Sequence, residues 1–297
     1  METTPPMPGP AQIFDSRLLR ARQVRAAPAM GGHAFLLDYV AADLADRVTL
    51  MQRRFALGLD LGAHGDGLSA ALLATGKVGR MLRAAPVAAL TGAADGAAIV
   101  CDQEALPFAP QSLDLVVCAL GLQFANDLPG ALLQIRRALK PDGLFLAALL
   151  GGRTLEELRA AFAAAEIETT GGLSPRVAPF ADVRDLGQLM QRAGFALPVA
   201  DADLLRVTYP SPLALMQDLK AMGASNVLEQ RRKIPLRRNT LAAVIAYYER
   251  EFSAMGRIPA SFEIVTLTGW APHASQQQPL KPGSARASLA KTLGQND

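Results

Sequence analysis

With half of its 297 residues apolar, the chain can bury one substantial core. Its formal net charge of +3 provides no overall field strong enough to hold nucleic acid or an anionic membrane surface. Its two cysteines, Cys101 and Cys118, lack the spacing of a metal site or a disulfide framework, which fits a reducing compartment such as the cytoplasm.

The two ends of the chain differ in composition from its middle. Residues 1–12 are rich in proline and lack the basic and then apolar pattern of a secretory signal, so they predict a disordered tail. Residues 275–297 are rich in Gln, Pro, Gly and Ser and predict a second disordered tail. No apolar run approaches the roughly 20 residues of a transmembrane helix. We therefore expect one ordered domain over residues 13–274.

The first half of that domain begins with two predicted helices. Residues from Ile13 to Ala27 alternate apolar and arginine side chains, which is typical of a helix that caps the domain or binds a partner. A second helix is predicted from Phe35 to Leu50. The apolar run from Phe55 to Leu61 then leads into a glycine-rich turn, as a buried parallel strand does before a helix.

Strands and helices alternate through the centre of the sequence. The spacing from Leu128 to Leu139 is helical, and the Pro141-Asp142-Gly143 sequence predicts a turn after it. Such alternation favours right-handed βαβ units and a doubly wound, Rossmann-like α/β fold. The further buried strands are predicted at Gly79–Leu82, Ala97–Cys101, Leu113–Ala119 and Leu144–Leu150.

The last third of the domain completes the predicted sheet of seven strands. Helices are expected at Leu155–Ala165 and Val183–Ala193, the second closed by Gly194. Strands are expected at Val199–Tyr209 and Phe262–Thr268. Between these strands lies a helical insertion, at about residues 210–255, which can serve as a lid, a binding element or a structural cap.

Polar residues and glycines follow the predicted strands at the edge where α/β sheets bind ligands. The turn after the first strand contains glycines that let a ligand approach the backbone, although a tight turn without a ligand has the same composition. Asp102 and Gln103 follow the third strand, where a carboxylate and an amide can bind an adenine ring. Asp102 can equally be a turn residue.

The central motifs resemble those of class I methyltransferases, which use S-adenosylmethionine. In that class an acidic residue, an apolar-Pro-Phe step, an Asp-apolar strand and a Lys-Pro-Asp-Gly turn succeed one another. The corresponding segments here are Asp102-Gln103, Leu106-Pro107-Phe108, Leu113–Val117 and Leu139–Gly143.

A narrower resemblance covers roughly Ile13 to Trp270. The segment Gly121–Leu128 is similar to one shared by the malonyl-carrier-protein methyltransferases of biotin synthesis and a mitochondrial assembly-factor family of respiratory complex I. Six other segments are similar to the assembly factor alone: Ile13-Phe14-Asp15, Gly151–Arg159, Gly171–Pro175, Pro179-Phe180, Asp185-Leu186-Gly187 and Ala221–Asn226.

This resemblance implies a cofactor, S-adenosylmethionine, and a protein substrate in the peripheral arm of complex I, with any membrane association passing through that partner. The assembly-factor family is credited with hydroxylating an arginine of a complex I subunit. Gln123 and Phe124 would face the reacting group as the catalytic positions. The cofactor would be surrounded by Asp60, Gly62, Ala63, His64, Gly65, Asp102, Gln103 and Leu120.

Some residues depart from the class pattern. Ala85 stands where an acidic residue usually binds the ribose, and His64 interrupts the glycine turn. No metal site is predicted, because His33, His64 and His273 lie far apart, and we expect His33 and His273 to be ordinary surface or packing residues. Two alternatives remain open: an O-methyltransferase of biotin synthesis, and a non-catalytic assembly chaperone with a decayed cofactor site.

Overall fold

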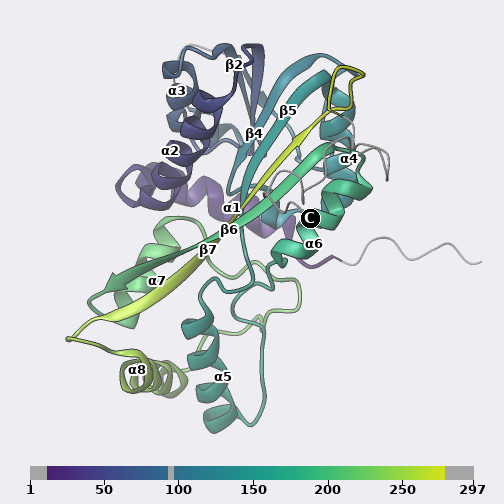
Figure 1. The fold of residues 1–297 in the computed structure, drawn as a ribbon. Coiled ribbons are helices and arrows are strands. Elements are labelled where there is room, and N and C mark those ends of the chain that lie inside the picture. Colours follow the sequence, from purple (N-terminus) through teal and green to yellow (C-terminus); the bar gives the residue numbers. More distant parts are fainter. Residues whose placement is uncertain (1–11, 93–96, 278–297) are drawn as a thin grey trace, which may run out of the picture.

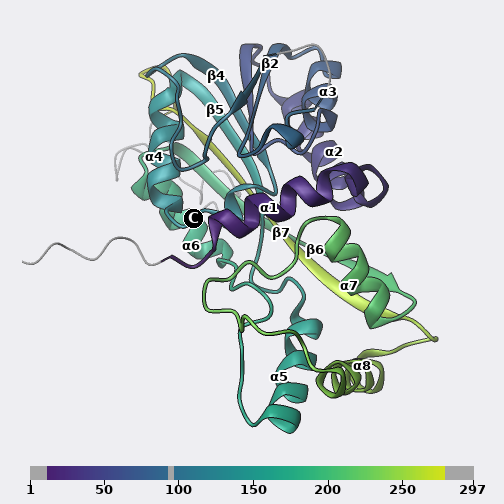
Figure 2. The same cartoon turned by 180° about the vertical axis from the view of Figure 1, so that it is seen from behind.

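The protein is described from a computed structural model over residues 12–92 and 97–277 (Figure 1, Figure 2). Most of the two predicted tails therefore lies outside the described residues.

Seven strands form one sheet in the order β3-β2-β1-β4-β5-β7-β6. The first five strands run parallel, and β7 runs antiparallel to both β5 and β6. This confirms the predicted doubly wound fold with a mostly parallel sheet. The strands are β1 (Phe55–Leu61), β2 (Val78–Ala85), β3 (Ala98–Val100), β4 (Leu113–Ala119), β5 (Leu139–Leu150), β6 (Ala196–Tyr209) and β7 (Ile258–Trp270).

Helices cover both faces of this sheet (Figure 1). The α-helices are α1 (Ser16–Ala26), α2 (Phe35–Leu50), α3 (Gly67–Ala74), α4 (Leu128–Ala138), α5 (Glu156–Thr170), α6 (Val183–Arg192), α7 (Pro212–Ala221) and α8 (Arg238–Phe252). In the part of the chain that the structure describes, the 3-10 helices are η1 (Ala27–His33), η2 (Ala88–Leu90) and η3 (Leu122–Phe124).

The strand β4 explains the two-layered core. Every residue of β4 is buried, and successive side chains point to opposite faces of a strand. Leu115 and Val117 pack with α2 and α3 in one cluster, whereas Val116 and Cys118 pack with α4 and α6 in another. A continuous apolar run was therefore a reliable signal for a strand covered on both sides.

The predicted turn at Pro141-Asp142-Gly143 is instead an irregularity inside a strand. β5 begins at Leu139, and the register shifts so that Leu139 pairs with Leu113 while Leu144 pairs with Leu115. Asp142 has φ 62, and Ala271 bonds to the backbone of Asp142 and Gly143 at 3.0 and 2.8 Å. These bonds extend the pairing of β5 past the Pro-Asp-Gly sequence, so the prediction of a separate turn was wrong.

The strand β7 pairs with β5 only from Ile264 onward. The part of β7 before Ile264 pairs with β6 alone and extends beyond the parallel strands. The helices α5, α7 and α8 pack around this two-stranded extension, below the parallel strands in Figure 1. Tyr248 donates to the Pro259 carbonyl at 2.7 Å, and the buried carboxylate of Glu157 accepts from the Ser261 hydroxyl at 2.6 Å. The helical insertion thus forms a lower lobe with α5.

Among the described residues, no helix is both long enough and apolar enough to cross a membrane.

Candidate functional site

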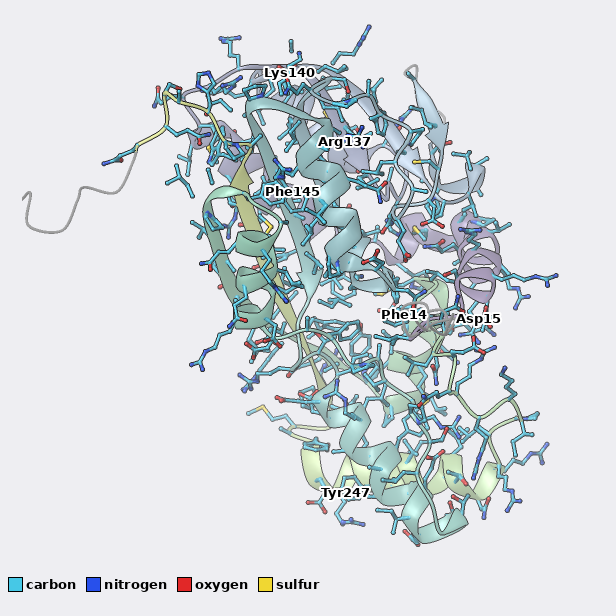
Figure 3. All side chains as sticks on the ribbon, turned by 90° about the vertical axis from the view of Figure 1, so that its right-hand side faces the viewer. Phe14, Asp15, Arg137, Lys140, Phe145 and Tyr247 are labelled. Carbon is cyan, nitrogen blue, oxygen red and sulfur yellow. The ribbon has the colours of Figure 1, made fainter. Side chains whose placement is uncertain are left out.

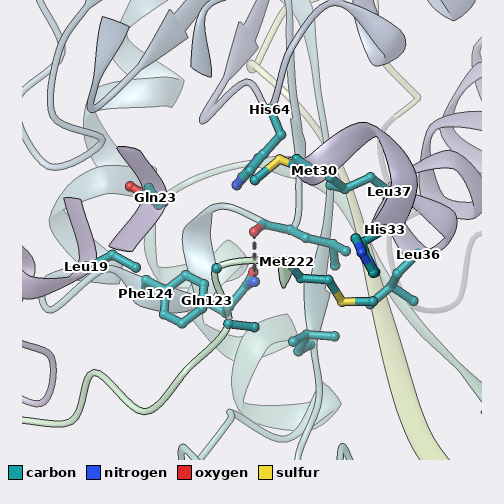
Figure 4. A pocket seen from close by; sticks show the side chains of 14 residues that line it. Leu19, Gln23, Met30, His33, Leu36, Leu37, His64, Gln123, Phe124 and Met222 are labelled. Atoms are coloured by element: carbon teal, nitrogen blue, oxygen red, sulfur yellow. Dashed lines mark hydrogen bonds between the residues drawn. The ribbon is translucent and has the colours of Figure 1, made fainter. Parts of the chain in front are cut away.

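Three neighbouring cavities lie at the carboxyl ends of β1, β3 and β4, where the predicted site residues come together. The central cavity is about 70 Å³ and is lined by His64, Leu120, Gln123 and Phe124 (Figure 4). A second cavity is lined by Asp102, Gln103 and Phe124, and a third by Asp60, His64 and Gly65.

The glycine turn after β1 uses the conformational freedom of two glycines. Gly62 and Gly65 have φ values of 74° and 91°, which favour glycine. A Cβ atom on Gly62 would lie 2.5 Å from Gln103 Nε2, so a side chain at this position would displace the Gln103 amide. Ala63 opens on none of the three cavities; it packs against Ala26 and Met30 instead.

Burial sets the charge of Asp60, near the end of β1, and of His64, on the turn that follows. Asp60 is buried, and desolvation raises the pKa of its carboxyl to about 7, although Ser69 Oγ donates to it at 3.1 Å. Desolvation lowers the pKa of His64 to about 4, so this imidazole is neutral near pH 7. The turn therefore offers neutral or weakly charged polar groups to a ligand.

The central cavity collects buried polar atoms that have no partner. Among the described residues these atoms include Gln23 Oε1, His64 Nδ1 and Gln123 Oε1, all in residues that line this cavity. Gln123 Nε2 donates to the Leu120 carbonyl at 2.8 Å, which leaves its oxygen as the unpaired atom. Because an unsatisfied buried polar group costs about 1–3 kcal/mol, three of them around one cavity indicate a site built for a polar ligand.

In the second cavity, the two carboxylate oxygens of Asp102 make different contacts, one within a turn and one in an exposed ion pair. Its Oδ1 accepts from the Glu104 backbone N–H at 3.0 Å, as a turn aspartate does. Its Oδ2 forms an ion pair with Arg20 of α1, and both side chains are about two-fifths exposed. The N-terminal helix therefore covers the carboxylate that was predicted to bind adenine.

The N-terminal segment is fastened over the site by Asn126, a residue of the segment Gly121–Leu128. Asn126 Oδ1 accepts from the backbone N–H groups of Ile13 and Phe14, both at 2.8 Å, and its Nδ2 donates to the Phe14 carbonyl at 3.1 Å. The ring of Phe14 then meets Phe124 edge-on, with centroids 5.6 Å apart. Figure 3 shows Phe14 and Asp15 between the upper sheet and the lower lobe.

Beside the central cavity lies a larger apolar cavity of about 250 Å³, here called the vestibule, which shares Leu36, Phe124, Leu150, Met222 and Ala224 with it. Its other walls come from α5, from residues 176–180 and from the insertion.

One wall of the vestibule is held by a buried carboxylate. Glu166, which is 1% exposed, accepts from the Ser174 N–H at 2.7 Å and from Arg176 Nε at 2.7 Å. These contacts explain why the Gly171–Pro175 motif can form a fixed loop.

Several lining residues were missed from the sequence. Gln23 and Met30 come from the N-terminal helices, and Met222 from the insertion. His33 was expected to be an ordinary surface or packing residue, but it lines the central cavity. The signals in the sequence that pointed to the insertion wall were the Ala221–Asn226 motif and the predicted helical insertion itself.

The remaining reactive side chains have simple environments. Cys118 is buried, which raises the pKa of its thiol to about 12, whereas Cys101 is only half-buried. Across residues 12–92 and 97–277, no three His, Cys, Asp or Glu side chains come together as a metal-binding group.

This sheet order, with cavities at the ends of β1, β3 and β4, defines a protein with the methyltransferase fold. A model of the methyltransferase domain matches residues 59–147. The crystal structure of the YcgJ protein from Bacillus subtilis has the same fold, with a TM-score of 0.53 at 14% identity over 78% of this chain and 98% of that one.

Relatives by sequence narrow this class to a family. The mouse protein called arginine-hydroxylase NDUFAF5, mitochondrial, is 40% identical, and the match covers 98% of this chain and 86% of the mouse protein. The human protein of the same name is also 40% identical, over 96% of this chain and 84% of its own length. The chain belongs to the family of these NDUFAF5 proteins. A malonyl-[acyl-carrier protein] O-methyltransferase from a Methylovorus species is 34% identical over 90% of this chain and 93% of that protein.

The residues present fit S-adenosylmethionine at two of its three parts. The unpaired atoms Gln23 Oε1 and His64 Nδ1 of the central cavity suit the ammonium group of the methionine end, and Asp102 and Gln103 suit an adenine ring. At the ribose position Ala85 is buried and offers no hydrogen-bonding group. The central cavity, at about 70 Å³, holds only part of such a cofactor, whose adenine ring would lie in the second cavity.

Proposed function

We propose that this protein binds S-adenosylmethionine and modifies an arginine side chain of a respiratory complex I subunit during assembly. The observation that carries the proposal is the convergence of Gln23, His64 and Gln123, each with an unpaired buried polar atom, on one cavity at the strand ends. The name of the NDUFAF5 relatives, arginine-hydroxylase, supports arginine as the target.

The chain itself would bind and orient both reactants. Asp102 and Gln103 would hold the adenine, and Gln123 and Phe124 would lie between the methionine end and the vestibule. When bound, the cofactor supplies a methyl group already activated on a sulfonium, so that alignment and exclusion of water carry most of the catalysis. The vestibule would admit the substrate side chain through its apolar walls.

Calorimetry with S-adenosylmethionine tests the cofactor part. We expect micromolar binding by the wild type and a loss of at least tenfold in Asp102→Ala, because a charge-assisted hydrogen bond contributes about 1.5–3 kcal/mol. Asp203→Ala, at an exposed position on β6, is the matched control and should bind as the wild type does.

Mass spectrometry of complex I subunits, with and without the protein, tests the reaction. A mass gain of one methyl group or of one oxygen on an arginine peptide would identify the chemistry. Cofactor binding without any mass change would contradict the proposed reaction.

Two other functions predict different results. An O-methyltransferase of biotin synthesis would restore growth of a biotin auxotroph, a possibility raised by the Methylovorus relative. An assembly chaperone would bind a complex I subunit in stoichiometric amounts but would bind no cofactor, a possibility raised by Ala85.

A further inference from the structure

A chain of three hydrogen-bonded side chains reaches the central cavity from the lower lobe. His33, the last residue of η1, lines the cavity (Figure 4), and its Nδ1 lies 2.5 Å from Asp218 Oδ1. The other carboxylate oxygen, Asp218 Oδ2, accepts from the Tyr209 hydroxyl at 2.7 Å. Asp218 belongs to α7 and Tyr209 ends β6, so the insertion holds this imidazole in place.

The two partners fix which nitrogen of His33 carries the proton. Tyr209 is buried, and desolvation raises the pKa of its hydroxyl, which stays protonated and donates to Asp218. A carboxylate beside Nδ1 keeps the proton of a neutral imidazole on Nδ1. Nε2 is then left with a lone pair, and among the described residues no group donates to it.

The same cavity holds a second free acceptor on another wall. Gln123 Oε1 is buried without a partner, and its orientation is set by the bond from Nε2 to the Leu120 carbonyl. Much of the remaining lining is apolar: Leu19, Met30, Leu36, Leu37, Phe124, Leu150 and Met222. Acceptors in apolar surroundings favour a ligand that brings N–H donors.

The vestibule limits the shape of such a ligand. Its apolar walls lead into the central cavity past Leu36, Phe124 and Met222, which suits an apolar stem followed by a donor group. A guanidinium carries five N–H donors in one plane and can serve two separated acceptors at once, whereas an ammonium is a compact point donor.

We propose that His33 Nε2, together with Gln123 Oε1, binds the N–H groups of the substrate guanidinium, and that Asp218 and Tyr209 are positioning residues for His33. This inference rests on the proposed function and assigns the residues that recognise its substrate. It gives the insertion a direct part in substrate recognition.

The experiment uses the full chain, S-adenosylhomocysteine, and two probes of similar length, N-acetyl-arginine amide and N-acetyl-norleucine amide. Nitrogen-15 NMR should show His33 with a proton on Nδ1 and a free Nε2, and the arginine probe should shift the Nε2 resonance. The norleucine probe should leave that resonance unchanged.

Variants separate recognition from structure. His33→Asn keeps an N–H toward Asp218 but places nothing at Nε2, so we expect an unchanged melting temperature and at least tenfold weaker binding of the arginine probe. His33→Gln, which can place an amide oxygen near Nε2, should recover part of that loss. Asp218→Asn should also weaken binding, because its amide N–H would favour the tautomer with a proton on Nε2. His273→Asn, at an exposed histidine, is the control and should bind normally.

Two results would overturn the inference: an arginine probe that does not bind the wild type, or binding that His33→Asn leaves unchanged. Cofactor binding and a modified subunit alongside either result would leave the proposed function standing. If the arginine probe shifts the His33 resonance but the protein neither binds the cofactor nor modifies a subunit, the arginine site stands and the proposed function is wrong.

Discussion

Replacing Asn126 with alanine should release the N-terminal segment from the site. The substitution removes the hydrogen bonds to the N–H groups of Ile13 and Phe14 and to the Phe14 carbonyl, together with a longer one, of 3.3 Å, to Ser16 Oγ. Each such bond contributes about 0.5–1.5 kcal/mol, and partial exposure places this set near the lower end, so we expect a loss of about 2 kcal/mol. A loss of that size corresponds to roughly thirtyfold easier opening of the segment.

Hydrogen exchange of the Ile13 and Phe14 amides measures this opening directly, and urea unfolding measures the global change. Ser16→Ala is the control, because it removes only a 3.3 Å contact to Asn126 Nδ2 and should change little. Unchanged exchange at Phe14 in Asn126→Ala would refute the reasoning, since the pairing of Phe14 with the insertion would then suffice to hold the segment.

Three further results are expected. Burial raises the pKa of Asp60 from 3.8 to about 7, so the free energy of unfolding of the wild type falls as the pH rises through this interval. In urea unfolding, Asp60→Asn should therefore gain more stability relative to the wild type at pH 8 than at pH 4. Arg20→Ala should strengthen cofactor binding by at most about fivefold at low salt, in calorimetry, because it frees Asp102 from an exposed ion pair. Cys118 should stay unmodified by a thiol reagent at pH 8 in the folded protein, because its thiol is buried and its pKa is about 12.

Each of these has a clear contrary result. A stability difference between Asp60→Asn and the wild type that does not depend on pH would mean that the pKa of Asp60 is the same in the folded and unfolded states. An equal gain of affinity in Arg17→Ala, at an exposed residue of α1 without an ion pair among the described residues, would point to net charge rather than to the Asp102 contact. Rapid labelling of Cys118 would indicate local opening of β4.

The sequence predicted the central strands well because burial on both faces leaves a continuous apolar run. The limits of β1 and β4 agree with their predictions, Phe55–Leu61 and Leu113–Ala119. The start of β5 was missed because the Pro-Asp-Gly sequence has the composition of a turn, and only the bonds from Ala271, far along the chain, make it part of the sheet.

Among the residues that line the central cavity, those that directly follow a strand could be predicted from the sequence. His64, Leu120, Gln123 and Phe124 follow strands, and the rule for α/β sheets placed them together. Gln23 and His33 reach the cavity because separate helices dock over it, which depends on tertiary contacts rather than on local pattern. The same holds for Asp218, whose contact with His33 joins residues on η1 and α7.

The bridge between Phe14 and Leu228 has a consequence for the order in which the protein matures. Phe14 leaves the ribosome more than two hundred residues before its partner is made, so the segment around Phe14 must wait while the parallel strands form. Closing so long a loop is entropically slow, which makes this contact one of the last to form. A nascent chain that ends before the insertion would thus carry the five parallel strands with an open site, because β6 has no partner before β7 is made. The site would close only after α7 and the segment behind it have been synthesised.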